Sequence, residues 1–99
     1  MLFAIETRIA VGDEIQYLEQ IFEAESAHAA WKWVDQVRLP ASRMGRVDLL
    51  DWKLSRFSPA KIDSTGQSLD GAWYFEICSA DTLFDAERNV RSHDEEMAR

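Results

Sequence analysis

The sequence predicts a single small α+β domain over residues 1–99, in which an antiparallel β-sheet of about four strands packs two helices on one face. Two observations predict this fold. Apolar and polar residues alternate in three stretches, as in half-buried strands, and apolar residues recur at helical spacing in two others. The elements follow the order β-β-α-β-β-α, and 99 residues are enough for one such domain and no more.

The first two strands are predicted as a hairpin. Residues 2–11 alternate and place one apolar set on one face: Phe3, Ile5, Ile9 and Val11. Gly12-Asp13 follows, and a glycine-first pair is typical of a tight hairpin turn. Residues 14–24 are therefore predicted as the second strand, although a helix also fits their apolar spacing. The adjacent turn favours the strand.

The register of this hairpin stays open at the level of sequence. A two-residue turn pairs Val11 with Glu14 and leaves four residues off the core face: Ala4, Ile15, Tyr17 and Ile21. A three-residue turn, Gly12 to Glu14, pairs Val11 with Ile15 instead and leaves out Leu18 and Phe22. The second strand is apolar on both sides, so large apolar residues remain on the helix-free face in either register.

A helix is predicted over residues 27–38. Ser26 is a suitable N-cap, because its hydroxyl can accept a hydrogen bond from the first free backbone amides. The apolar stripe comprises Ala27, Ala30, Val34 and Val37. Trp31 and Trp33 flank this stripe on its two sides, where they are either half-buried at the helix borders or available as an exposed aromatic anchor. Pro40 is expected to stop the helix.

The loop after this helix is basic, with Arg38, Arg43 and Arg46 close together in the chain. Such a group is a candidate for binding an anion such as phosphate. A solvated loop that balances an acidic protein is the simpler interpretation.

The second half repeats the order of the first. Residues 47–57 alternate around Trp52 and predict a third strand, although helical spacing fits them as well. A polar loop then leads to a fourth strand, residues 72–78, whose expected core face holds Trp73, Phe75 and Ile77. Thr82 to Asp85 matches a capping box. The helix that follows carries Leu83, Ala86, Val90 and Met97 on one stripe, and residues 92–99 are expected to fray.

Composition argues against several functions. Acidic residues outnumber basic ones by 18 to 11, and the net charge of -7 disfavours nucleic acid and anionic membranes as partners. The chain has no stretch of roughly 20 apolar residues for crossing a bilayer and does not start like a signal peptide. Its one cysteine, Cys78, allows no internal disulfide, which fits a reducing, cytoplasmic location.

No motif points to catalysis, and we expect neither a metal nor a cofactor. The chain has no glycine-rich phosphate loop and no paired-cysteine zinc spacing. His28 is expected on the surface, His93 in a solvated run of charges, and Cys78 in a buried structural position. A small-ligand binder or an enzyme stays a minor alternative.

The aromatic content favours a protein-interaction role. Four Trp, two Tyr and five Phe are more than so small a domain can bury, and aromatic side chains are the usual anchors of interfaces. We predict a non-enzymatic protein that self-associates as a homodimer through the open sheet face, or binds another protein there. The interface candidates are Ile15, Tyr17, Ile21, Trp31, Trp33 and Tyr74. Nucleic-acid or phosphate binding through the loop Arg38–Arg46 is the alternative.

Overall fold

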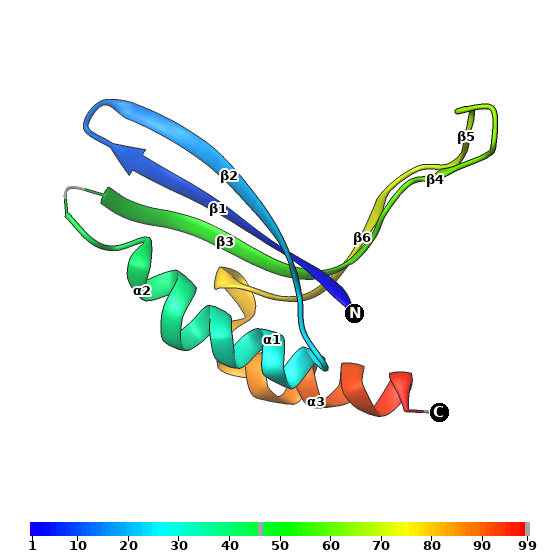
Figure 1. Cartoon of the computed structure of the whole chain (residues 1–99). Helices are drawn as coiled ribbons and strands as arrows, with labels where there is room; N and C mark the ends of the chain where they lie inside the picture. Colours follow the sequence, from blue (N-terminus) through cyan, green and yellow to red (C-terminus); the bar gives the residue numbers. More distant parts are fainter. Residues whose placement is uncertain (46, 99) are drawn as a thin grey trace.

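The computed structural model describes residues 1–45 and 47–98, and of residues 68–70 it describes the backbone alone. Four antiparallel strands form one sheet in the spatial order β2-β1-β3-β6. They are β1 (Leu2–Val11), β2 (Glu14–Glu23), β3 (Val47–Ser58) and β6 (Trp73–Ser79). The helices lie together on one side of this sheet, and among the described residues the other side carries none (Figure 1). The predicted fold class and element order are confirmed.

The register of the first hairpin is that of a two-residue turn. Val11 pairs with Glu14 and Phe3 with Phe22. Gly12 adopts φ +61°, the left-handed conformation that glycine tolerates best, at the first central position of the turn. The three-residue alternative is therefore excluded.

The core lies between the sheet and the helices. Phe3 and Ile5 of β1 and Leu54 of β3 are fully buried in it. Trp52 of β3 stacks on Trp31 of the first helix, with ring centroids 5.5 Å apart. Aromatic side chains bury large apolar areas, so this pair contributes much of the packing between the two layers.

The first helical region continues past the proline that was expected to stop it. Its parts are α1 (Ala27–Trp33), a π-helical turn (Val34–Arg38) and α2 (Leu39–Ala41). The predicted cap is confirmed, since the Ser26 hydroxyl accepts a hydrogen bond from the amide of Ala29. The Leu39 amide reaches back five residues to the carbonyl of Val34. This wider turn leaves room for the ring of Pro40, which has no N–H of its own to place.

A bulge in β6 interrupts the predicted alternation of that strand. Leu54 pairs with Cys78 but the next residue of β3, Ser55, pairs with Glu76, so Ile77 is an extra residue. The bulge shifts the alternation, and the adjacent residues Ile77 and Cys78 are both buried. Trp73 and Phe75 lie beyond the bulge and are 46% and 50% exposed, so the expectation that they are core residues is wrong.

A second, small hairpin interrupts the predicted polar loop. It consists of β4 (Lys61–Ile62) and β5 (Ser68–Asp70), and it projects away from the body of the domain (Figure 1). The carboxylate of Asp63 accepts hydrogen bonds from the backbone amides of Thr65 and Gln67 and so shapes the turn. The radius of gyration is 15.1 Å. A compact domain of this length has roughly 12.6 Å, so the shape is extended.

The last helix starts and ends differently from its prediction. A 3-10 turn (Ala80–Asp85) precedes α3 (Ala86–Met97), and the capping box joins Ser79 with Thr82. Leu83, expected on the buried stripe, is 52% exposed on the 3-10 turn. The helix extends past residue 92 to Met97, and Asp94 accepts hydrogen bonds from the backbone amides of Ala27 and His28 at 2.8 and 3.0 Å. Packing against α1 thus holds the C-terminal turns of α3 in place.

Candidate functional site

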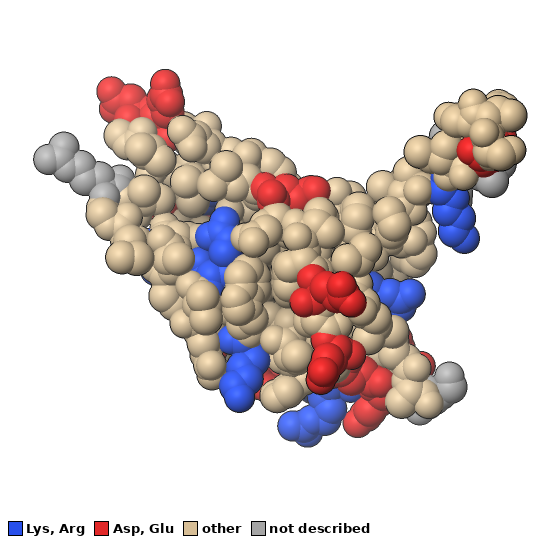
Figure 2. All heavy atoms as spheres, in the orientation of Figure 1, with Lys and Arg blue, Asp and Glu red and all other residues tan. Residues whose placement is uncertain are grey.

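The candidate site is the helix-free face of the four-stranded sheet, called the open face below. The residues that the register places on it include Ala4, Glu6, Arg8, Ala10, Ile15, Tyr17, Glu19, Ile21, Asp51, Lys53, Ser55, Phe57, Tyr74 and Glu76. The β1–β2 hairpin and the β4–β5 hairpin rise on its two sides (Figure 1), and the surface between them is hollowed (Figure 2). The open face is therefore a saddle with a hairpin at each end.

Large apolar side chains are exposed on this saddle. Ile15 and Tyr17 are 67% and 63% exposed, and Ile21 and Tyr74 are 39% and 43% exposed. Ile15, Tyr17 and Ile21 come from one strand, because strict alternation and the two-residue turn aim them to the same side. Tyr74 comes from the opposite edge of the sheet.

Two small residues form the floor of the saddle. Ala4 and Ser55 are partners in the β1–β3 register and both are fully buried. Tyr74 donates its hydroxyl hydrogen bond to Glu19, at 2.9 and 3.1 Å from the two carboxylate oxygens. Because β1 and β3 lie between the strands of these two residues, the contact spans the floor. The small side chains of Ala4 and Ser55 leave the space for it.

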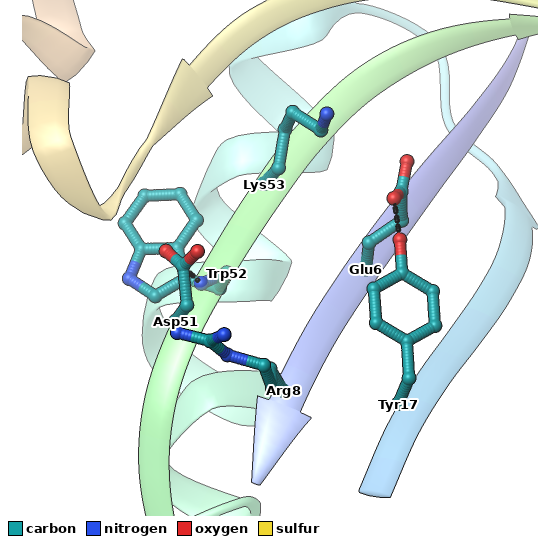
Figure 3. A pocket seen from close by; sticks show the side chains of 6 residues that line it. All are labelled: Glu6, Arg8, Tyr17, Asp51, Trp52 and Lys53. Carbon is teal, nitrogen blue, oxygen red and sulfur yellow. Dashed lines mark hydrogen bonds between the residues drawn. The ribbon is translucent and has the colours of Figure 1, made fainter.

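Charged side chains of both signs line a cleft of about 320 Å³ on the open face (Figure 3). Glu6 lies opposite Lys53 in the register, and Arg8 lies opposite Asp51. Opposite charges at facing positions of neighbouring strands favour this register. The hydroxyl of Tyr17 donates a hydrogen bond to the carboxylate of Glu6. The cleft is thus a small array of alternating charges with an aromatic ring at its side.

The chemistry of the open face suits binding better than proton transfer. The hydrogen bond to Glu19, then burial and the charges of Glu19 and Glu6, raise the pKa of Tyr74 above its usual 10. Tyr74 therefore remains a protonated donor at neutral pH. Tyr17 also donates to a carboxylate, and neither histidine belongs to this face. Within the described residues no three His, Cys, Asp or Glu side chains are grouped as metal ligands would be.

The interface candidates divide into two groups. Ile15, Tyr17, Ile21 and Tyr74 all lie on the open face. Trp31 is only 4% exposed, and its indole N–H donates to Glu87, so it cannot supply the expected exposed anchor. Trp33 packs on Phe22 with ring centroids 4.7 Å apart, on the helix side of the sheet. Both tryptophans therefore belong to the packing of the domain.

Of the polar members of the site, Tyr17 and Tyr74 are predicted as candidates from the sequence, whereas Glu6, Arg8 and Glu19 are not. Glu6 and Arg8 alternate with the core residues of β1, and this signal could have placed them beside Ala4. Glu19 and Tyr74 lie 55 residues apart, and no local pattern relates them.

The basic loop does not form one anion site in the described residues. The guanidinium of Arg38 turns inward and donates to the side chains of Gln20 at 3.2 Å and Thr7 at 3.4 Å. It also donates a hydrogen bond to the hydroxyl of Ser42. Arg43 is exposed, and Arg46 lies outside the described residues. Arg38 therefore joins the helix to the sheet.

The histidines and the cysteine lie away from the open face. His28 is exposed, as predicted, whereas His93 is only 7% exposed and does not belong to a solvated run of charges. Cys78 is buried as predicted. Burial, followed by the charges of Glu76 and Glu87, raises its pKa to about 12, so the thiolate is strongly disfavoured.

The fold and the open face define a small α+β domain with one helix-covered and one uncovered sheet face. No protein-family model matches the sequence, and no curated protein or solved structure is significantly similar to it. Across residues 1–45 and 47–98, no helix is both long enough and apolar enough to cross a membrane.

Proposed function

We propose that the protein is a non-enzymatic protein-interaction module that self-associates through its open face. The observation that supports this proposal is that Ile15, Tyr17, Ile21 and Tyr74 are exposed on one face, which no helix of residues 1–45 and 47–98 covers. Large aromatic and aliphatic side chains of this kind anchor interfaces, and a contiguous exposed patch on a small domain marks an interaction surface.

The charges of the open face favour a second copy of the chain as the partner. An interface between two copies related by a two-fold axis must be complementary to itself. Arg8 and Lys53 lie beside Glu6 and Asp51, so a two-fold rotation can bring basic groups of one copy against acidic groups of the other. The tyrosine hydroxyls that bind Glu6 and Glu19 lower the cost of removing these carboxylates from water.

The alternative, anion or nucleic-acid binding through the basic loop, has weaker support. Arg38 already donates to Thr7, Gln20 and Ser42. A net charge of -7 opposes the approach of a polyanion. Retention on heparin that is lost on Arg43→Glu would favour this alternative over ours.

The test is the molar mass in solution, measured by light scattering at micromolar concentration. Ile21→Lys places a charge in the open face and should weaken the dimer by about tenfold or more. Val37→Lys is the matched control, because Val37 is also exposed, at 53%, but lies on the helical layer. A dimer in the wild type and in Val37→Lys, with a shift towards monomer in Ile21→Lys, supports the proposal. A wild-type monomer overturns self-association.

A further inference from the structure

A second cleft lies on the helix side of the sheet, at the base of the β4–β5 hairpin. It measures about 410 Å³ and is lined by Arg56, Trp73, Phe75, His93, Glu96 and Met97. Phe75 pairs with Arg56 and Trp73 pairs with Ser58, so both aromatic residues belong to the last residue pairs between β3 and β6. The rings of Trp73 and Phe75 are about half exposed there. They form an aromatic wall on the side of the sheet away from the open face.

Two polar groups in this cleft lack a matching partner. The guanidinium of Arg56 contacts the thioether sulfur of Met97 at 3.5 Å, and a thioether is only a weak acceptor. In the part of the chain that the structure describes, no carboxylate lies within 4.0 Å of it. His93 is 93% buried, its ring lies 6.0 Å from that of Phe75, and its Nε2 atom has no hydrogen-bond partner among the described residues. Buried polar atoms without partners are rare in folded domains.

We infer that this cleft binds a small flat carboxylate, with its ring against Trp73 and Phe75 and its carboxylate on Arg56. The planar guanidinium matches a carboxylate through two parallel hydrogen bonds. The cleft volume is that of a small-ligand site. Glu96 lies exposed at the rim. Its negative charge favours a ligand with a single negative charge over a phosphate ester with two.

The inference is independent of the proposed self-association, because the cleft and the open face are on opposite sides of the sheet. Its test is an NMR titration of the wild-type protein with benzoate, benzamide and phenyl phosphate, following the indole N–H of Trp73. Benzoate should give saturable shifts. Benzamide has the same ring without the charge and should bind about tenfold more weakly. Phenyl phosphate should bind more weakly than benzoate, and tighter binding would overturn the assignment to a carboxylate.

Variants locate the site. Arg56→Met should weaken benzoate binding by about tenfold or more. Arg56→Lys keeps the charge but loses the planar pair of donors, so this variant should bind benzoate several-fold more weakly. It also provides the test if Arg56→Met does not fold. Lys61→Gln removes the same charge from an exposed position outside the cleft and should leave binding unchanged. Benzoate binding that is absent, or that is unaffected by both Arg56 variants, would overturn the inference.

Discussion

Tyr74 and Glu19 join the two edges of the sheet. Tyr74 lies on β6 and Glu19 on β2, which are the two edge strands of the sheet. The phenol hydroxyl donates a hydrogen bond to the carboxylate at 2.9 Å. The contact is made possible by small buried residues on the two central strands. It gives the open face an aromatic bridge across its floor, and the self-association proposed above would cover this bridge.

The bridge can be tested through the ionisation of Tyr74. Glu19→Gln removes the carboxylate that raises the pKa of Tyr74, so this pKa should fall towards its usual 10. The measurement is the phenolate absorbance against pH, in a Tyr17→Phe background so that one tyrosine remains. Glu23→Gln, four residues further along β2, is the control and should leave the titration unchanged. If the titration curve of Tyr74 were the same with Glu19→Gln as without it, the bridge would not form in solution.

Replacing Trp52 and Trp73 should have very different effects on stability. Trp52 is 5% exposed and stacks on Trp31, so Trp52→Ala should lower the free energy of unfolding by about 3–5 kcal/mol. Trp73 is 46% exposed, and Trp73→Ala should cost about 1 kcal/mol or less. Urea unfolding of both variants measures the difference. A large loss for Trp73→Ala would restore the core role that alternation alone predicts for it.

His93 should make the stability depend on pH. Burial, and then the positive charge of Arg56, lower its pKa in the folded state below the usual 6.5, while Asp94 and Glu96 oppose the shift. Below pH 6.5 the unfolded chain binds a proton at His93 more readily than the folded chain does. The contribution of neutral His93 to stability is therefore fully present above pH 6.5 and is lost as the pH falls through the folded-state pKa. His93→Phe should remove this component of the pH dependence, and His28→Phe, at an exposed site, should retain it. Identical slopes for the two variants would contradict the prediction.

Cys78 should be inert in the folded protein. Its pKa of about 12 leaves almost no thiolate at pH 8, and the side chain is buried. Iodoacetamide should therefore modify the native protein at a rate limited by unfolding, and the denatured protein rapidly. Mass spectrometry of timed samples measures both rates. Rapid modification of the native protein would show that the thiol is accessible.

Asp94 should stabilise the start of α1. Its carboxylate accepts hydrogen bonds from the amides of Ala27 and His28, which have no partner inside the helix. Asp94→Ala should lower the free energy of unfolding by about 1 kcal/mol, as loss of an N-cap does. Glu95→Ala, at the exposed neighbour, is the control and should have little effect. Equal stabilities would mean that the contact between the helices is not maintained in solution.

The four main strands, the helices and their order were predictable from the chain alone, because they depend on local patterns, whereas the small β4–β5 hairpin was not. Alternation predicted a strand in residues 2–11 and favoured one in residues 47–57, where helical spacing fitted as well. Ser26 indicated a helix start, and Gly12-Asp13 indicated the hairpin turn. The apolar residues that β2 contributes to the open face could also be predicted from local patterns. Once the turn is known, alternation places Ile15, Tyr17 and Ile21 on one face without reference to any distant residue.

Which surfaces are covered depends on the packing of segments that are distant in the sequence. The bulge at Ile77 depends on pairing with β3, and it moves Cys78 into the core while Trp73 and Phe75 lie half exposed beyond it. His93 is buried because α3 lies against the sheet, although its neighbours in the sequence are charged. The bridge from Tyr74 to Glu19 needs three pairs of adjacent strands in their final register. Burial and long-range contacts are properties of packed elements, and a periodic pattern in one segment carries no information about what lies opposite it.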